Sequence, residues 1–392
     1  SNKSTYGTYD ILSGYDTDPV DMVYIWVNTS DPKFIRELNR LSRQEHANPL
    51  EILAKNRYRD WGTLKYSLRS VEKFAPWIRT VHLVTSGQIP FWLNMDNRRI
   101  NIITHKEIFP NRSDLPTFSS AAIECHLHRI LGLSKRFIYM RDDVIFTDTV
   151  DLSYFYTESA GYKLQLNKDE MDYCNKLCRM TSVNNGICEK NCATASCEFD
   201  GEDCMNVEQL PDYIEPDRNL IDSTQVSLRH TGFIFNKVFG PKDMVMPIPG
   251  PYMLDRDIVS GMMNSFTHES KTTSSTKIEN NMTFQPVFAY YNYLRVKEQS
   301  RNLNIKTTTK WSVLEVSHTD LSIRQKDPVV NLLKNIIKRS GTFLVLSNYF
   351  PENIYRESRE RIFIQVLEDL LPTPSQFEVM NNKAIRDHSI LY

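Results

Sequence analysis

Six of the seven cysteines lie within 31 residues, at Cys174, Cys178, Cys188, Cys192, Cys197 and Cys204. Such a density implies a disulfide framework or a metal site. A zinc site needs paired Cys-x2-Cys ligands or nearby histidines, and the segment contains neither. The even count, irregular spacing and low apolar content indicate a small unit that needs disulfides because it cannot bury a sufficient core. Oxidised cysteines place the chain in the secretory pathway or outside the cell.

The seventh cysteine, Cys125, is either a buried inert thiol or one half of an intermolecular disulfide, because an unpaired cysteine is unusual in an oxidising compartment. Three glycosylation sequons agree with such a compartment, at Asn28, Asn111 and Asn281. They are weak support, since short motifs arise by chance. We expect glycans at Asn111 and Asn281.

The composition excludes several classes of protein. The 392 residues, 41% hydrophobic and 24% charged, are those of an ordinary globular chain of two or three domains. The 47 basic and 48 acidic side chains leave no basic field for nucleic acid. No apolar run approaches the roughly 18 residues of a membrane span, and no signal peptide is present, so we expect any membrane anchor to lie outside this chain.

Strand and helix patterns alternate along the first part of the chain. This alternation predicts an α/β fold, a Rossmann-like and mostly parallel sheet flanked by helices. We expect an N-terminal arm over 1–20, a discontinuous catalytic domain over 21–167 and 209–392, and the cysteine-rich insert over 168–208. The expected strands are 21–27, 79–85, 99–104 and 136–140, and the expected helices are 34–46, 61–74, 119–131 and 359–371.

Polar side chains follow two of the expected strands, in the turn Asn28–Asp31 and at Asp142-Asp143. Ligands of parallel sheets lie beyond the carboxyl ends of the strands, so these residues can share one crevice. An acidic pair can hold Mg²⁺ or Mn²⁺ on a diphosphate, because hard oxygen ligands suit these ions. The alternative is an acidic surface turn.

Glu124, His126, His128 and Arg129 lie close together in the expected helix 119–131. Helical spacing puts Glu124 and His128 on one face, with His126 elsewhere. A carboxylate and an imidazole are candidate general bases, and Arg129 is a candidate phosphate partner. The alternative is a surface helix with salt bridges. The chain lacks the short motifs of P-loop ATPases, dinucleotide enzymes, α/β-hydrolases and zincins.

The cysteine-rich segment resembles a Lin-12/Notch repeat. The resemblance rests on the spacing C-x3-C-x9-C-x3-C-x4-C-x6-C and on the ending Phe199-Asp-Gly-Glu-Asp-Cys204. It implies the pairs Cys174–Cys197, Cys178–Cys192 and Cys188–Cys204. It also implies one Ca²⁺ ion held by Asn185, Asp200 and Asp203, consistent with the preference of Ca²⁺ for oxygen ligands.

The remainder resembles the Stealth family. Residues 21–32 are similar to its first conserved region, and the segments 64–78, 83–93, 115–119, 123–130 and 137–144 are similar to its second. Such proteins transfer a sugar 1-phosphate from a nucleotide sugar to a sugar hydroxyl. With a Notch-type repeat, the resemblance implies transfer of N-acetylglucosamine 1-phosphate from UDP-N-acetylglucosamine to mannose 6-hydroxyls of lysosomal glycoproteins, with release of UMP. This tagging would occur at the lumenal side of the Golgi membrane, in a homodimer that can carry an accessory subunit.

The same resemblance assigns roles to individual residues. Glu124 and Asp143 fall on catalytic positions, and Asp142 accompanies them. The substrate-binding residues are Asn28, Ser30, Asp31, Arg69, His126 and Arg129. The chemistry needs one base and neutralisation of the phosphate charge by Mg²⁺ or Mn²⁺ and an arginine.

Three departures from the family pattern leave alternatives open. Arg141 stands where the family has asparagine, no histidine occurs in 246–255, and Glu279-Asn280-Asn281 replaces an expected arginine. One alternative is a weakly active or inactive member that binds glycoproteins. Another is a UDP-sugar glycosyltransferase, which would release UDP.

Overall fold

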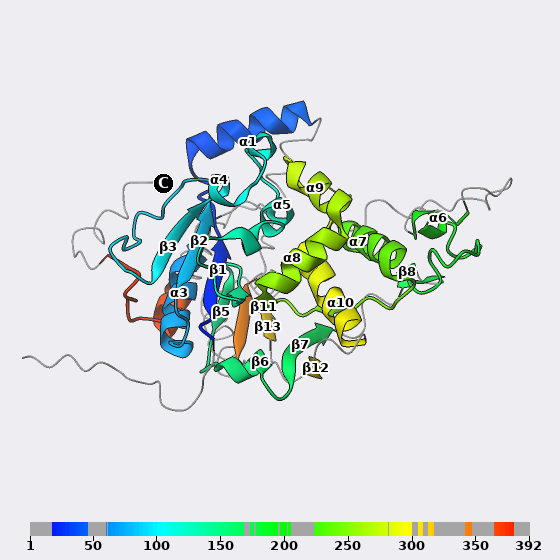
Figure 1. Ribbon diagram of the computed structural model, residues 1–392. Helices are drawn as coiled ribbons and strands as arrows, with labels where there is room; N and C mark the ends of the chain where they lie inside the picture. Colours follow the sequence, from blue (N-terminus) through cyan, green and yellow to red (C-terminus); the bar gives the residue numbers. More distant parts are fainter. Residues whose placement is uncertain are drawn as a thin grey trace, which may run out of the picture.

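A five-stranded sheet forms the centre of the computed structural model (Figure 1). The structure describes residues 18–45, 60, 62–167, 173–175, 178–194, 197–201, 203–204, 223–280, 282–299, 305–308, 313–316, 342–346 and 364–379. The expected arm over 1–20 lies outside these residues except for its last three. The sequon residue Asn281 also lies outside them.

Four parallel strands and one antiparallel edge strand make up the central sheet, in the order β11-β4-β1-β2-β3. The strands are β1 (Asp21–Ile25), β2 (Val81–Thr85), β3 (Ile100–Thr104), β4 (Arg136–Tyr139) and β11 (Tyr252–Asp255). β1 is paired on both sides, with β2 and with β4, and its apolar side chains are buried on both faces. Such continuous apolar runs are typical of parallel strands covered by helices. The expected mostly parallel α/β fold is confirmed.

The carboxylate of Asp21 holds together the amino-terminal ends of three strands. It is fully buried at the start of β1 and accepts hydrogen bonds from Arg79 Nε (2.8 Å) and from the backbone N–H of Ser134 (2.8 Å). His82 Nε2 lies 3.2 Å away. Burial opposes ionisation of this carboxyl, yet the contacts with His82, Arg79 and Ser134 outweigh it and hold the pKa of Asp21 well below its usual value.

Helices α1 (Pro32–Gln44) and α3 (Thr63–Phe74) follow the local signals of the sequence. The side chain of Asp31 caps α1 by accepting from the N–H of Lys33 (2.8 Å), and Pro32 occupies the first turn. Gly62 precedes α3 with φ +68°, a conformation that favours glycine. α3 packs on β5 (Val144–Phe146), to which Ser67 donates a hydrogen bond at the carbonyl of Val144 (2.7 Å).

The expected helix 119–131 is wrong. The structure has α5 (Ser120–Glu124), a turn, and the 3-10 helix η2 (Leu127–Arg129). Ser119 caps α5 by accepting from the N–H of Ala122, and the N–H groups of Cys125 and His126 bond back three or four residues at the end of α5. Since the helix is interrupted after Glu124, the argument that Glu124 and His128 share one helical face fails.

After the cysteine-rich insert the chain returns to strands that precede it. β11 pairs with β4, and both β10 (Met246–Pro247) and β12 (Ile305–Thr308) pair with β7 (Gly161–Asn167). β14 (Phe343–Leu346) pairs with β5 and with β13 (Val313–Val316). The other elements are α4 (His105–Ile108), η1 (Arg112–Asp114), η3 (Leu152–Tyr154), β6 (Tyr156–Thr157), β8 (Tyr173–Asn175), β9 (Cys178–Arg179) and α6 (Glu198–Gly201).

The helices α7 (Ser223–Phe239), α8 (Arg256–Ser265), α9 (Thr267–Ser275) and α10 (Pro286–Gln299) lie between the central sheet and the disulfide-rich insert (Figure 1). Met180 of the insert packs on α7 at Gly232, where an added Cβ would lie 3.0 Å from the Met180 methyl group. Asn236 Nδ2 donates to the carbonyl of Met180 (3.2 Å). One hydrophobic core therefore runs from the sheet into the insert.

Candidate active site

The carboxyl ends of β1 and β4 gather acidic side chains. Asp142 and Asp143 follow β4, and Asp60 is held beside β1 by a hydrogen bond from Trp26 Nε1 to its Oδ2 (3.2 Å). Thr63 at the start of α3 donates to Asp142 Oδ2 (3.3 Å). Because β1 and β4 are neighbouring parallel strands, these residues lie at the same edge of the sheet.

Glu124, at the end of α5, reaches this edge through the last residue of β4. The hydroxyl of Tyr139 donates to Glu124 Oε1 (2.9 Å). Burial raises the pKa of the Glu124 carboxyl to about 8. The hydrogen bond from Tyr139 and the charge of Arg141 oppose this shift, and the carboxylate of Glu279 adds to it. A carboxyl with such a pKa is protonated or ionised according to small changes near neutral pH, as a general base or acid requires.

The guanidinium of Arg141 connects Glu124 with the acidic pair. It forms an ion pair with Asp143 Oδ2, and its positive charge also lowers the pKa values of Glu124 and Asp142. Tyr252 of β11 is within electrostatic reach of Glu124, Asp143 and Arg141. The Arg141 guanidinium thus pairs with Asp143 and is within electrostatic reach of Glu124, of Asp142 and of Tyr252 in the bend 246–256.

The oxygens of the acidic pair suit a divalent cation. Burial, with the neighbouring charges of Asp143 and Asp60, raises the pKa of Asp142 to about 7, and the positive charge of Arg141 only partly opposes this shift. Asp143 is 5% exposed, and its Oδ1 has no hydrogen-bond partner among the described residues. Buried, unsatisfied carboxylate oxygens are the ligands that Mg²⁺ and Mn²⁺ prefer, so the donor set fits the expected ion.

The turn after β1 lies next to the loop after β2. Gln88 donates to the carbonyl of Asn28 (3.0 Å) and to Asp31 Oδ2 (2.9 Å), and its own Oε1 accepts from the Asn28 N–H (2.8 Å). The Asn28 Oδ1 accepts from the N–H of Ser30 (2.9 Å), whose side chain is exposed. The side-chain oxygens of Asn28 and Asp31 therefore shape the turn, and the exposed Ser30 hydroxyl is the group left to face a ligand.

Arg69 is not brought to the acidic cluster. Its guanidinium is buried and donates to both oxygens of Glu378 (2.8 Å each), to Glu368 Oε2 (3.0 Å) and to the carbonyl of Leu371 (2.6 Å). The contacts fasten the segment 364–379 to α3, where Gln376 also bonds Glu72. A direct contact of Arg69 with the donor stays a prediction that this geometry does not favour.

His126 and Arg129 face different surroundings. His126 is 7% exposed, and its Nε2 lies 2.8 Å from the Ser274 hydroxyl, which donates in turn to Asp114 (2.6 Å). Burial lowers the pKa of His126 to about 3, so the ring is neutral and packs against Phe109. Arg129 is exposed on η2. Neither residue contacts Glu124 in a way that supports a shared catalytic role, and their substrate contacts stay predictions.

Sequence reasoning missed several residues of the cluster. Tyr139 lies inside an apolar strand run, and a period of two puts it on the opposite face from Asp142, so the strand pattern does not mark it. Tyr252 and Glu279 lie beyond the insert, and no local signal places them beside Glu124. Asp60 carries no motif at all. Asn111, a predicted glycosylation site, is exposed at the start of η1, and its glycan stays a prediction.

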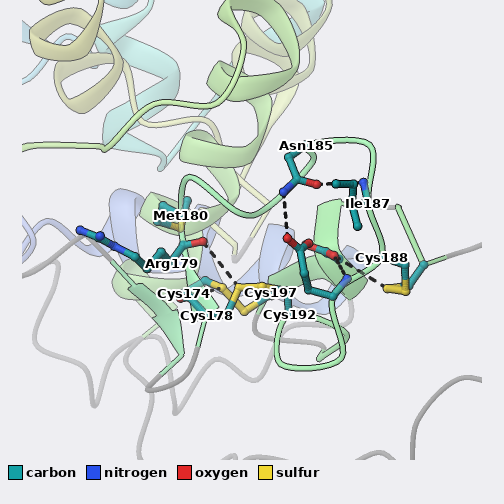
Figure 2. The surroundings of a disulfide bond; sticks show 12 residues. Cys174, Cys178, Arg179, Met180, Asn185, Ile187, Cys188, Cys192 and Cys197 are labelled. Carbon is teal, nitrogen blue, oxygen red and sulfur yellow. Dashed lines mark hydrogen bonds between the residues drawn. A yellow bond between two sulfur atoms is a disulfide. The ribbon is translucent and has the colours of Figure 1, made fainter.

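The insert contains the three expected disulfides, Cys174–Cys197, Cys178–Cys192 and Cys188–Cys204 (Figure 2). Among the described residues, two groups of three His, Cys, Asp or Glu side chains are compact enough to hold a metal ion: Cys174, Cys178 and Cys197, and Cys178, Cys192 and Asp200. Both rest on cysteines of these disulfide bonds. Disulfide sulfurs are not thiolates, so these groups are not metal sites. Cys125 is a buried free thiol next to Glu124, and burial raises its pKa well above the usual value.

The expected calcium ligands lie together in the insert. Asp200 is buried, accepts from the Glu189 N–H (2.7 Å), and keeps Oδ1 without a partner among the described residues. Figure 2 shows the Asn185 side chain beside Ile187, whose N–H donates to Asn185 Oδ1 (2.8 Å). The Asn185 Nδ2 donates to Glu189 Oε1 (2.9 Å). Asp203 accepts from the Gly186 N–H (2.9 Å).

These contacts leave oxygens for an ion. The pKa of Asp200 is raised to about 7, mainly by burial and in smaller part by Glu189 and Asp203. Glu189 Oε2, like Asp200 Oδ1, is buried without a partner in the described part of the chain. The unpaired oxygens of Asp200 and Glu189 are donors of the kind that Ca²⁺ prefers, and Glu189 is a candidate ligand that sequence reasoning missed.

Two family models match separate parts of the chain. Residues 57–164 match Stealth protein CR2, conserved region 2, and residues 171–205 match the LNR domain. Glu124, Asp142 and Asp143 fall within the first match. The chain therefore contains the second conserved region of Stealth proteins followed by an LNR domain, and both predicted resemblances are confirmed.

The curated relatives are phosphotransferases. The chain is 48% identical over 154 residues to the N-acetylglucosamine-1-phosphotransferase subunits alpha/beta of Mus musculus and 47% identical over the same length to those of Homo sapiens. These alignments span 39% of this chain and 12% of each relative. A capsular polysaccharide phosphotransferase of Streptococcus thermophilus is 39% identical over 137 residues, 35% of this chain and 57% of that protein.

Among solved structures, the galactosyltransferase LgtC in complex with donor and acceptor sugar analogs aligns with 91% of this chain and 98% of its own. The TM-score is 0.36 and the identity 11%, so this likeness bears on neither fold nor function. Within the described part of the chain, none of the helices combines the length and the apolar character of a membrane span.

The raised pKa of Glu124 predicts a pH-dependent stability. The folded chain binds this proton more tightly than the unfolded chain, whose carboxyl has the ordinary value of 4.5. The contribution to stability is full below pH 4.5 and is lost as the pH rises through about 8. The neutral isostere Glu124→Gln should therefore gain melting temperature relative to wild type between pH 5 and pH 9. Because Glu124 is only partly buried, we expect a gain of a few degrees, corresponding to about 1 kcal/mol.

The matched control is Glu158→Gln, an exposed carboxylate on the same chain. Its melting temperature should follow wild type across the whole range. A Glu124→Gln difference that is the same at pH 5 and pH 9 would show that Glu124 has an ordinary pKa.

Proposed function

We propose that this chain transfers a sugar 1-phosphate from a nucleotide sugar to a sugar hydroxyl. The observation that carries the proposal is the meeting of Glu124, Asp142 and Asp143 around Arg141 at the carboxyl edge of the parallel sheet. Phosphoryl transfer needs a positioned base and neutralisation of phosphate charge, and this cluster supplies both. The phosphotransferase relatives match the segment that contains these residues.

The reaction that fits is attack of an acceptor hydroxyl on the phosphorus that carries the sugar. Glu124, as the carboxylate, accepts the hydroxyl proton, and Tyr139 holds its Oε1 in position. The new oxygen–phosphorus bond forms as the bond to the second phosphate breaks, and the nucleoside monophosphate leaves. Asp142 and Asp143 would hold Mg²⁺ or Mn²⁺, which supplies charge neutralisation at the diphosphate when bound. Arg141 is the arginine available to the phosphate.

The mammalian relatives support a choice of substrates within this proposal. The 47–48% identity across this segment supports UDP-N-acetylglucosamine as donor, with UMP as product. We further propose that the acceptor is the 6-hydroxyl of mannose on lysosomal glycoproteins. The three disulfides and the LNR domain support a place in the secretory pathway, and we propose the Golgi lumen. A homodimer with an accessory subunit is part of the same proposal.

One observation favours a second candidate, a binding protein without turnover. Glu279 accepts from Ser120 (3.1 Å) and Gln285 (3.0 Å) and is close enough to Glu124 to raise its pKa. The Glu279 carboxylate beside Glu124 would repel the negative charge of a diphosphate. The strand β11 carries Tyr252, where the family pattern has a histidine nearby. Binding of glycoproteins without phosphate transfer is therefore the alternative.

The product of the reaction separates these functions. With UDP-N-acetylglucosamine, Mn²⁺ and a mannoside, we expect release of UMP, measured by chromatography. Asp143→Asn should lower the rate at least about 100-fold, because it removes an ion ligand and the partner of Arg141. The matched control, Asp148→Asn, changes an exposed residue just after β5 and should leave the rate unchanged.

UDP in place of UMP would make the chain a glycosyltransferase. Retention of donor and glycoprotein without any nucleotide product would support the binding protein instead.

We also propose that the LNR domain binds one Ca²⁺ ion through Asn185, Asp200 and Asp203, with Glu189 as a further ligand. Removal of Ca²⁺ by a chelator should lower the melting temperature, since an ion that binds only the folded state adds about 2.7 kcal/mol at 100 times its Kd. Asp200→Asn should abolish the Ca²⁺-dependent shift, and the exposed control Asp96→Asn should retain it. Equal shifts in wild type and Asp200→Asn would contradict this site.

A further inference from the structure

Arg141 occupies one oxygen of the residue best suited to hold a metal ion. Its guanidinium pairs with Asp143 Oδ2, while Asp143 Oδ1 is buried and lacks a partner among the described residues. A guanidinium and a divalent cation compete for the same carboxylate, because each must lie against its oxygens to be stabilised. The ion pair thus occupies one of the two carboxylate oxygens of Asp143, the expected metal ligand.

The two partners of this ion pair differ in freedom. The Asp143 side chain is 5% exposed and fixed in the turn between β4 and β5, whereas the Arg141 side chain is 54% exposed. Breaking the pair by moving Arg141 leaves the carboxylate in place and costs the arginine little, since a half-exposed guanidinium regains water. Any rearrangement at this site is therefore a movement of Arg141.

A diphosphate is the ligand that can move it. The planar fork of an arginine binds two phosphate oxygens at once, and two negative charges on the diphosphate compete well against the one on Asp143. The guanidinium pairs with Asp143 at the carboxyl edge of the sheet and is within electrostatic reach of Glu124 and Asp142, so the donor that the proposed function requires would arrive at this group.

We propose that Arg141 is a latch that covers Asp143 until a nucleotide diphosphate draws it away and opens Asp143 to the cation. The inference rests on the proposed function for the identity of the donor. Its consequence is that Arg141 disfavours the cation in the free protein and no longer does so once the nucleotide is bound. By linkage, the nucleotide and the cation then reinforce each other's binding.

The test measures Mn²⁺ affinity from the free-ion signal in electron paramagnetic resonance, without turnover, in the presence and absence of UDP. Without UDP, Arg141→Asn should bind Mn²⁺ about tenfold more tightly than wild type, within the usual range of coupling between sites. At saturating UDP the two affinities should converge, because the latch is open in wild type too. Arg141→Asn should also bind UDP more weakly in the absence of metal.

Two further variants complete the experiment. Arg141→Lys keeps the charge beside Asp143 and should bind Mn²⁺ as weakly as wild type without UDP, which separates loss of the latch from a folding defect. Arg43→Asn makes the matched change at an exposed arginine of α1 and should behave as wild type.

Equal Mn²⁺ affinity of wild type and Arg141→Asn without UDP would overturn the latch. So would a tenfold difference that persists unchanged at saturating UDP, since Arg141 would then stay on Asp143. Release of UMP together with either result would leave the proposed function standing and reject the latch alone. If UMP is not released but the Mn²⁺ affinities follow the expected pattern, the latch stands and the proposed function is rejected.

Discussion

The buried carboxylate of Asp21 is the interaction on which the central sheet depends. It joins β1 to the chain just before β2 through Arg79, to β2 itself through His82, and to the start of β4 through the backbone of Ser134. With the amino-terminal ends of these strands fixed in register, their carboxyl ends must also meet at one edge. The residues of that edge are free to be acidic because the stability of the sheet is supplied at the opposite end and in its apolar interior.

The carboxyl edge of the sheet, where the candidate site lies, has the opposite balance of charge to the surroundings of Asp21. At Asp21, hydrogen bonds and positive charges more than compensate the burial of one carboxylate, whereas at the candidate site several carboxylates face a single guanidinium. Burial is the main cause of the raised pKa values of Glu124 and Asp142, and the neighbouring carboxylates Glu279, Asp143 and Asp60 add to them. Like charges held close in a partly buried place are stabilised by a ligand that brings cations, and a metal-bound nucleotide is such a ligand.

The sequence predicts those parts of the structure whose signals are local. Asp31-Pro32 marks the start of α1, the apolar run after Asp21 marks β1, and the cysteine spacing specifies three disulfides through its resemblance to the LNR domain. Sequence-based prediction fails where contacts between distant parts of the chain determine the structure. The helix expected over 119–131 is interrupted after Glu124. Arg69 forms an ion pair with Glu378, 309 residues further along the chain.

The candidate site shows the same limit. Asp142 and Asp143 can be placed at a strand end from the sequence, and Glu124 can be assigned through the family resemblance. Tyr139, Tyr252 and Asp60 carry no motif, and they join the cluster only because β11 pairs with β4 and Asp60 bonds Trp26. Long-range strand pairing across an insert is not encoded in any short stretch of residues.

A crystal structure of the chain with UDP and Mn²⁺ tests the central claim most directly. The account predicts an anomalous Mn²⁺ peak at Asp142 and Asp143, with the diphosphate against the Arg141 guanidinium and Glu124 on the same side. A nucleotide bound at another edge of the sheet, or Glu124 and Asp143 directed to opposite faces of the molecule, would contradict it.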